Sequence, residues 1–425
     1  MWQKIEQIWK TPDLRNNILF VLAALVIFRL AAHVPIPGVD PAGLRNFFAN
    51  NQLFGLINIF SGGGLENFSV VMLGVGPYIT SSIIIQLLTM IVPRLEEISK
   101  DGESGQRRIN QYTRYLTIPL AVIQAYSFIV LFRSQGGGNI IGQMDAWQLT
   151  TSIITITAGT MFLMWLGELV SERKVGNGIS LLIFAGIVAS IPTQIQQAIV
   201  TFDQSQIFSI AAFLALAVLM VVAVVVVTEA QRNIPITYAR MIKGSKTYGG
   251  ATSYLPMRLL QAGVIPIIFA ISVILFPPMI AQFLAKSQSV WLTQAAAFTI
   301  NLFQNQLFYA VAYFVLVFAF TYFYTAVIFK PEQIAENLQK QGGFIPGIRP
   351  GHSTVDFLSR TMNYIILPGA LFLGLIAVLP LTMTAFTGSQ LLVIGGTSLL
   401  IVVQVVIESI KQINSQLVMR DYDEL

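Results

Sequence analysis

Long apolar stretches separated by short polar loops dominate this chain. Ten such segments follow one another, most of them near the roughly 20 residues that a helix needs to cross a hydrocarbon core. They cover residues 18–32, 73–92, 115–131, 149–170, 179–199, 207–228, 259–284, 307–329, 362–383 and 391–409. Backbone polar groups in lipid must pair within their own segment, and long continuous segments achieve this as helices. The pattern therefore predicts an all-α polytopic membrane protein with ten transmembrane helices.

Composition agrees with a membrane protein and removes several kinds of chemistry. Of the 425 residues, 55% are apolar and 11% are charged, against roughly 25% charged residues in soluble domains. The chain has no cysteine, which excludes disulfides, thiolate metal sites and cysteine nucleophiles. Its two histidines, His33 and His352, lie at a span end and in a loop, and neither an H-E-x-x-H nor a Walker-type motif occurs. We expect no enzymatic activity, no metal and no cofactor.

The distribution of basic residues predicts the orientation of the chain. With ten spans, 21 of the 25 Lys and Arg residues fall on the side of the two termini, and three, Arg45, Arg133 and Lys286, fall on the other side. Such a bias places both termini and the basic loops in the cytoplasm. The net charge of +5 is explained by this topology before any nucleic-acid partner is considered.

The amino-terminal segment is expected to remain attached and to lie on the membrane surface. Residues 1–17 are polar, and no small-x-small cleavage site follows the first apolar run. Within residues 2–9, two tryptophans and two isoleucines recur at helical spacing between charged residues, as in an interfacial helix.

The ten spans divide into two halves of five, which makes the halves opposite in orientation if they are structural repeats. We place the amino-terminal half at residues 1–200 and the carboxyl-terminal half at 207–412. The second span of each half is interrupted by glycine and proline, at Gly74, Gly76 and Pro77 and at Gly263, Pro266, Pro277 and Pro278. Interruptions at matching positions favour a central pathway, although kinks tolerated by packing are equally compatible with them.

Residues 54–68 are too short and too broken to form a span. An apolar run is followed by Ser61, Gly62, Gly63 and Gly64, which favours a re-entrant or partly inserted element. Such an element would act as a mobile stopper, and an ordinary external loop is the alternative.

The span interiors offer aliphatic side chains and almost no charge. Isoleucines recur four residues apart on one face of the second and fifth spans, as Ile79 with Ile83 and Ile183 with Ile187. Spacing alone leaves a pore-lining role and a core or lipid-facing role both open. Arg29, one turn from the end of the first span, is expected to snorkel to the interface. The scarcity of midplane charge disfavours an ion-coupled secondary transporter, the main alternative, and an intramembrane protease lacks a catalytic dyad.

Six motifs together resemble the SecY family, the channel subunits of the bacterial protein-conducting translocon. They are P-Y-I-T-S-S-I-I-I-Q-L-L-T at 77–89, G-E-S-G-Q-R-R-I-N-Q-Y-T-R-Y at 102–115, G-N-G-I-S-L-L-I-F-A-G-I-V at 176–188, A-G-V-I-P-I-I-F-A at 262–270, Q-G-G-F-I-P-G-I-R-P-G at 341–351 and G-G-T-S-L-L-I-V-V at 395–403. The resemblance covers nearly the whole chain in order.

The resemblance implies two pseudo-symmetric, inverted five-helix halves around an hourglass pore, with three kinds of site. The positions that match the pore ring are Ile79, Ile83, Ile183, Ile187, Ile268 and Ile401. The implied plug covers Ile57, Asn58, Ile59, Phe60, Ser61, Gly62, Gly63, Gly64, Leu65, Glu66 and Asn67. The lateral gate, formed by spans two, three, seven and eight, would contain Gln86, Thr89 and Ser272, for which ordinary interhelical hydrogen bonds are the alternative role.

The same resemblance implies partners, a location and a function. Cytoplasmic loops 230–258 and 330–360 would dock the SecA ATPase or the ribosome through Arg240, Lys243, Lys246 and Arg349. The small subunits SecE and SecG, signal sequences, preproteins and membrane lipid are the other implied partners. The implied function is a passive channel in the bacterial inner membrane that passes unfolded secretory polypeptides and releases apolar segments sideways into lipid.

Overall fold

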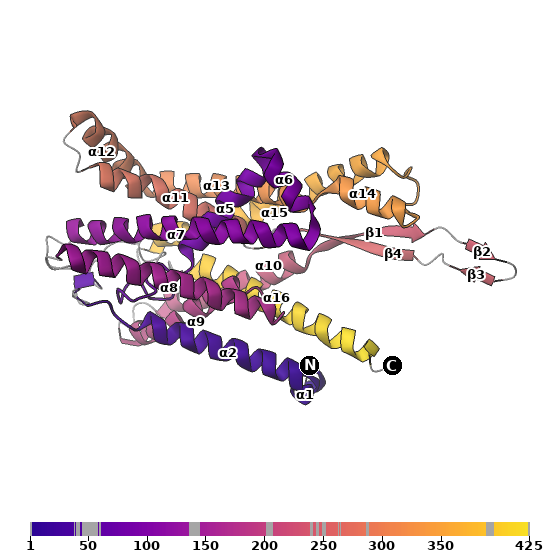
Figure 1. Cartoon of the computed structure of the whole chain (residues 1–425), viewed down its shortest axis with the longest axis horizontal. Coiled ribbons are helices and arrows are strands. Elements are labelled where there is room, and N and C mark those ends of the chain that lie inside the picture. Colours follow the sequence, from indigo (N-terminus) through magenta and orange to yellow (C-terminus); the bar gives the residue numbers. More distant parts are fainter. Residues whose placement is uncertain are drawn as a thin grey trace. The chain divides into compact units, whose positions relative to one another are not determined.

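The computed structural model of the chain is predominantly helical (Figure 1). It describes residues 2–37, 39, 43–44, 58, 61–135, 145–200, 207–238, 241–243, 246–248, 252–261, 263, 265–285, 289–387 and 395–423. The helices are α1 Trp2–Lys10, α2 Pro12–Ala32, α5 Gly76–Ile91, α6 Pro93–Lys100, α7 Gly102–Gln135, α8 Ala146–Glu172, α9 Gly178–Val200, α10 Ile207–Glu229, α11 Ile265–Leu284, α12 Val290–Gln304, α13 Gln306–Ile328, α14 Pro331–Lys340, α15 His352–Thr387 and α16 Gly395–Asp423. The strands are β1 Gln231–Tyr238, β2 Met241–Lys243, β3 Lys246–Tyr248, β4 Thr252–Arg258 and β5 Gly343–Phe344.

The described helices account for most of the predicted spans directly. Six of them are long and apolar enough to cross a membrane, and the pair α5–α6, bent by 102°, is a seventh candidate. Three further apolar helices, Gly178–Thr193, Ala215–Glu229 and Ile265–Pro278, are shorter. A helical membrane protein is thus confirmed, whereas the count of ten spans stays a prediction.

The bend between α5 and α6 follows from the local sequence. Pro93 has no backbone N–H to donate, and its ring pushes the preceding residue out of the helical conformation. Val92 accordingly has φ −100° and ψ 109°, in the extended region. Helix α5 therefore ends before Pro93, and α6 begins at this proline in a new direction.

The chain forms two compact units that are not simple sequence halves. One unit comprises Met1–Gln204, Met279–Ala297 and Val405–Leu425, and the other comprises Ser205–Pro278 and Phe298–Gln404. The first unit therefore contains α2, α5, α7, α8 and α9, and the second contains α10, α13, α14 and α15 with the strands.

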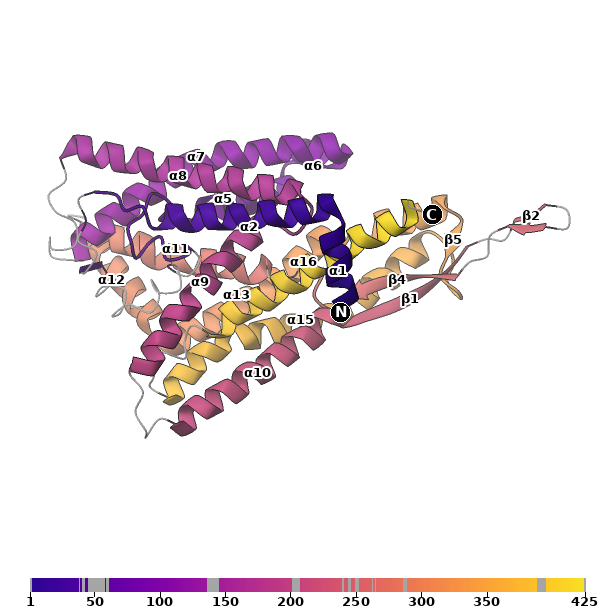
Figure 2. The ribbon, with the colours of Figure 1, turned by 90° about the horizontal axis from the view of Figure 1, so that it is seen from below.

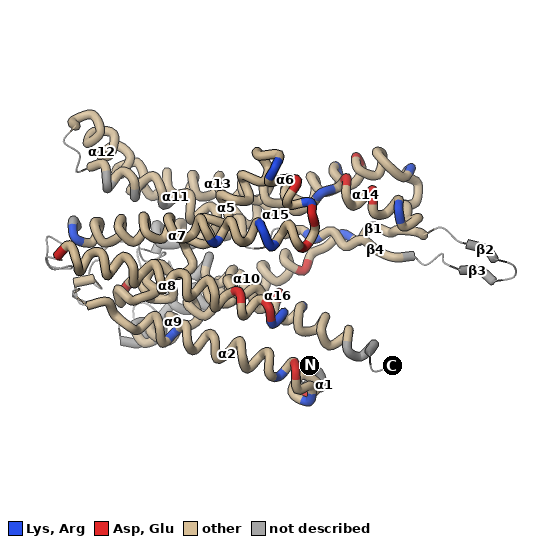
Figure 3. Tube along the Cα trace, in the orientation of Figure 1, with Lys and Arg blue, Asp and Glu red and all other residues tan. Residues whose placement is uncertain are grey.

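In the first unit, α7 packs against α5 and α8, and α8 also packs against α2 and α9. Figure 2 shows α7, α8 and α2 running along one another. Helices α8 and α9 approach closely because Gly178 has no side chain: a Cβ built there would lie 1.8 Å from the carbonyl oxygen of Gly167. Charged residues of these helices gather toward their ends, which leaves apolar middles (Figure 3).

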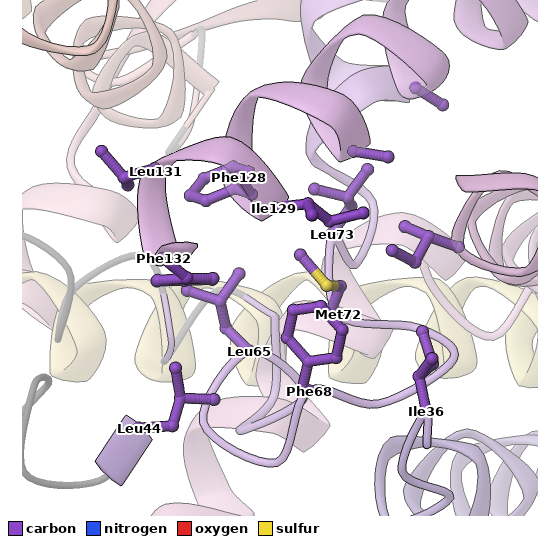
Figure 4. Packing of buried hydrophobic residues seen from close by; sticks show 13 residues of the cluster. Ile36, Leu44, Leu65, Phe68, Met72, Leu73, Phe128, Ile129, Leu131 and Phe132 are labelled. Atoms are coloured by element: carbon purple, nitrogen blue, oxygen red, sulfur yellow. The ribbon is translucent and has the colours of Figure 1, made fainter. Parts of the chain in front are cut away.

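A hydrophobic core in the first unit includes the segment that leads into α5. Leu65, Phe68 and Met72 are buried against α7, where Phe128 and Phe132 contribute the largest side chains (Figure 4). The rings of Phe68 and Phe132 meet edge to face with centroids 6.3 Å apart. The segment after residue 64 is therefore held in the core rather than looping freely outside it.

The second unit contains strands that the all-α prediction did not include. Helices α13 and α15 form its main helical pair, and β4, β1 and β5 form an antiparallel sheet beside them. Ile234 and Ile236 alternate along β1 and are buried, and Ile234 packs in a core with Met257 of β4 and Leu358 of α15. The strands β2 and β3 form a separate two-stranded antiparallel sheet (Figure 1). The expectation of a purely helical chain is corrected for the loop of residues 230–258.

Candidate functional site

Four of the six predicted pore isoleucines lie on two helices of the first unit. Ile83 on α5 and Ile183 and Ile187 on α9 are buried, and Ile79 on α5 is partly exposed. Both helices pack against α8, which gives them a common support. Each pair is spaced four residues apart, so its two side chains follow one another along one helix face.

The orientation of α5 is fixed from the opposite face. The hydroxyl of Ser81 donates a hydrogen bond of 2.6 Å to the carbonyl oxygen of Thr113 on α7, and Ser81 is fully buried. Because Ile79 and Ile83 are each two residues from Ser81, a rotation of about 200° separates them from the face that contacts α7. Helix α5 is thus held by a polar contact behind its isoleucine pair.

The other two predicted ring residues, Ile268 on α11 and Ile401 on α16, belong to the second unit. Ile401 is buried and Ile268 is partly exposed. The closing of a ring from all six side chains remains a prediction.

The predicted plug is partly described, since Ile57, Ile59 and Phe60 lie outside the described residues. Asn58 organises the part that is described. Its side chain donates to Glu66 Oε2 and accepts from the backbone N–H of Glu66, both at 2.9 Å. Its carbonyl oxygen accepts from the hydroxyl of Ser61 and from the N–H of Gly63. Residues 61–67 are therefore a compact turn and not an extended loop.

This turn is attached to the first unit at both of its sides. The backbone around Ser69 pairs with Pro35 in an isolated antiparallel bridge, which ties the segment to the end of α2. At the tip, a Cβ built on Gly62 would lie 2.5 Å from Cζ of Phe28 on α2 and 3.2 Å from Cα of Gly186 on α9. Gly186 directly precedes the predicted ring residue Ile187, so the tip of the predicted plug contacts the helix that carries half of the first-unit isoleucines.

The three polar residues predicted at the lateral gate form hydrogen bonds within their own helices. Gln86 Nε2 donates to Ser82 Oγ, Thr89 Oγ1 donates to the carbonyl oxygen of Gln86, and Ser272 Oγ donates to that of Ile268. Whether these residues form a gate or ordinary contacts between helices stays a prediction. Gln86 Oε1 is buried and has no hydrogen-bond partner among the described residues.

The first predicted docking loop, residues 230–258, contains the strands β1 to β4 of the second unit. Arg240 lies outside the described residues, whereas Lys243 and Lys246 are paired across β2 and β3. The hairpin had a signal in the sequence, because Gly244-Ser245 between two short β-forming runs is a typical two-residue turn.

The second predicted docking loop presents Arg349 on a rigid support. Ile345 is buried in the core beneath the sheet, and the hydroxyl of Thr354 donates a 3.0 Å hydrogen bond to the carbonyl oxygen of Arg349. The Arg349 side chain itself is exposed. On the neighbouring helix α14, a hydrogen bond from Lys340 lowers the pKa of the Glu336 carboxyl below its usual value.

One contact of this site was not predicted from the sequence. Arg29 was expected to snorkel, yet its Nη1 donates a hydrogen bond to the carbonyl oxygen of Gly62 in the predicted plug. The only sequence signal was a cation within an otherwise apolar span.

Comparison with known proteins places this geometry in a family. The SecY family profile matches residues 69–410. The protein translocase subunit SecY of Streptomyces galbus is 43% identical over 98% of this chain and 97% of its own length. The subunit of the same name from Mycobacterium bovis is 42% identical over 97% of each chain.

Solved structures agree at the level of the fold. A structure described as that of a protein conducting channel superposes with a TM-score of 0.63 at 17% identity, over 93% of this chain and 91% of that one. Sec61 in a canine ribosome-channel complex superposes with a TM-score of 0.61 at 16% identity over the same shares. With more than 40% identity to translocase subunits over almost its full length, this chain is a multi-pass membrane protein that belongs to the SecY family.

Proposed function

We propose that this chain is the channel subunit of a translocon and passes unfolded secretory polypeptides through an aliphatic constriction. The observation that carries the proposal is the contact of the glycine-rich turn with α9: Gly62 meets Gly186, next to the buried Ile187. A stopper in contact with a helix that carries two predicted ring residues is what a closed protein channel requires.

The aliphatic constriction suits this task for a physical reason. Bulky apolar side chains narrow a pore and favour its dewetting, which resists the flow of ions. They offer no specific polar contacts that would retain a passing polypeptide. Isoleucines such as Ile183 and Ile187 therefore seal the resting channel and let a chain slide through the open one.

We further propose ten spans in two inverted halves, residues 1–200 and 207–412, with a lateral gate between them. The six long helices, the bent pair and the three shorter apolar helices coincide with the ten apolar segments of the sequence, which supports this count. At the gate, each Leu or Ile at mid-membrane favours lipid by about 0.3 to 0.6 kcal/mol, and charged residues oppose it several times more strongly. Apolar segments would leave sideways by this partition alone.

The proposed location is the bacterial inner membrane, with both termini in the cytoplasm. The basic loops would then face the motor, which we propose to be SecA or the ribosome, and SecE and SecG would complete the translocon. The exposed Arg349 and the paired Lys243 and Lys246 support docking of an acidic or phosphate-rich partner. A ribosome-bound channel among the similar folds is consistent with the second motor.

Family membership removes the alternatives that the sequence left open. The relatives are translocase subunits, so the chain is a channel subunit and neither an enzyme nor a solute carrier. The channel is passive, and the driving force comes from its partners.

Reconstitution tests the proposal directly. The chain is incorporated with SecE and SecG into liposomes, and SecA, ATP and a secretory precursor are added. We expect precursor to become protected from protease only when ATP and a signal sequence are both present. Equal protection without ATP, or none with all components present and correctly inserted, contradicts a protein-conducting channel.

A further inference from the structure

Arg29 makes a contact that the proposed channel activity does not require. It lies on α2 within an apolar span, is half-buried, and donates from Nη1 to the carbonyl oxygen of Gly62. A cation in this position is costly unless it finds a partner. A guanidinium that donates to a backbone oxygen forms a charge-assisted hydrogen bond, which is stronger than a neutral one.

The carbonyl that Arg29 contacts sits at the tip of the predicted plug. Gly62 has φ +68°, in the left-handed region that favours glycine, and the turn around it is held by its own bonds, with the N–H of Gly63 donating to Asn58 at 2.8 Å. The tip therefore presents a defined backbone oxygen to α2.

Gly62 is also closely packed against other residues. Phe28, the residue before Arg29, and Gly186 of α9 both lie within about 3 Å of where a Cβ of Gly62 would be. Two adjacent residues of α2 therefore contact Gly62: Phe28 packs against it, and Arg29 donates a hydrogen bond to its carbonyl oxygen. By contrast, the segment beyond Gly64 is anchored by the burial of Leu65 and Phe68 in the core.

We propose that Arg29 is a latch that determines how readily this channel opens. Its hydrogen bond holds the plug tip, residues 61–64, against α2 and α9, and a signal sequence must break this bond to open the pore. The strength of the bond then sets which signal sequences are accepted, so Arg29 is a specificity-determining residue. The inference rests on the proposed channel function.

The latch is tested by Arg29→Met, which keeps an unbranched apolar stem and removes the donor. In reconstituted channels, we expect the resting ion conductance to rise about tenfold, equivalent to about 1.4 kcal/mol in the closing equilibrium. A precursor with a defective signal sequence should be translocated several-fold faster, while an authentic precursor keeps its rate. Arg133→Met is the matched control, because it removes an exposed Arg at the far end of α7.

A second pair of variants tests the latch without changing Arg29. Gly62 and Gly63 both have positive φ, so alanine strains the backbone at either position. Only at Gly62 would the new Cβ meet Phe28 and Gly186, whereas at Gly63 it meets no described atom within 4 Å. We expect Gly62→Ala to raise conductance like Arg29→Met, and Gly63→Ala to have a much smaller effect.

The possible results distinguish a failure of the Arg29 latch from a failure of the proposed channel function. Equal conductance and unchanged signal selection for Arg29→Met and Arg133→Met would overturn the latch, and so would equal effects of the two glycine variants. Arg29→Met combined with Gly62→Ala should leak no more than the stronger single variant, because both release the same contact, and independent multiplication of the two effects contradicts this. Failure of the unmodified chain to translocate an authentic precursor would instead refute the proposed function.

Discussion

Replacing Ile187 with asparagine is expected to open the resting seal. The buried isoleucine contributes about 2 kcal/mol of apolar transfer free energy, which corresponds to more than a tenfold change in the population of the sealed state. The amide also gives water a hydrogen-bonding partner at the constriction and opposes dewetting. Ion conductance in planar bilayers should therefore rise about tenfold or more, together with relaxed selection of signal sequences.

The matched control for this prediction is the neighbouring residue. Val188 is 37% exposed, whereas Ile187 is 3% exposed, and one residue along a helix rotates the side chain by about 100°. Val188→Asn introduces the same amide on a different face of α9 and should leave conductance near that of the unmodified channel. If Ile187→Asn leaves both conductance and signal selection unchanged, Ile187 does not belong to a pore ring.

Reversing the charge of Arg349 is expected to weaken docking of the motor without changing the fold or the resting conductance of the channel. The Arg349 side chain is exposed, and its loop is held by buried Ile345 and by the bond from Thr354, so Arg349→Glu should not affect folding. Translocation driven by SecA should fall at least about tenfold, equivalent to about 1.4 kcal/mol of docking free energy. The measurement is ATP-dependent protection of a precursor, with resting conductance as a check on the pore.

Arg107→Glu provides the comparison for charge alone. Arg107 is an exposed cation on α7 whose pair with Glu103, at 2.8 Å, is solvent-exposed and of little energetic weight. Each variant replaces one positive charge with a negative one, on the side of the membrane that we predict to be cytoplasmic. A loss of translocation of similar size in the two would show that Arg349 acts only through positive-inside topology and not through docking.

The helices were predictable because backbone polar groups in lipid must form hydrogen bonds within their own segment. A segment such as residues 149–170 must satisfy its N–H and C=O groups internally, and α8 does so over Ala146–Glu172. The end of α5 was also encoded locally, because Pro93 stops one helix and starts the next. Such features depend on near neighbours in the sequence.

The strands β1 to β5 were missed for a different reason. The hydropathy pattern used for spans ignores short strands, although Ile234 and Ile236 alternate as a half-buried strand requires. The pairing of β1 with β5 joins residues more than 100 positions apart, at Thr237 and Phe344. Nothing local in the sequence specifies such a pairing.

The hydrogen bond of Arg29 to Gly62 could not be predicted from the spacing of residues in the sequence. Snorkelling was the natural expectation for a cation one turn from a helix end. The acceptor is a backbone carbonyl 33 residues away, and a backbone group has no sequence signature. The predicted pore ring is an intermediate case: the isoleucine spacing was visible in the sequence, but its interpretation as a ring came from the resemblance to a family.

The most direct measurement uses the absence of cysteine from the chain. A single cysteine replaces Ile187, and a secretory precursor with its own cysteine is arrested in the reconstituted channel during SecA-driven transport. As a control, a separate variant carries its single cysteine at the exposed Ser353 of α15, where it should react with a soluble thiol reagent. We predict a disulfide between precursor and residue 187 that forms only with SecA and ATP. The absence of this crosslink, while Ser353→Cys still reacts and the precursor is still transported, contradicts the claim that the polypeptide passes the isoleucine constriction.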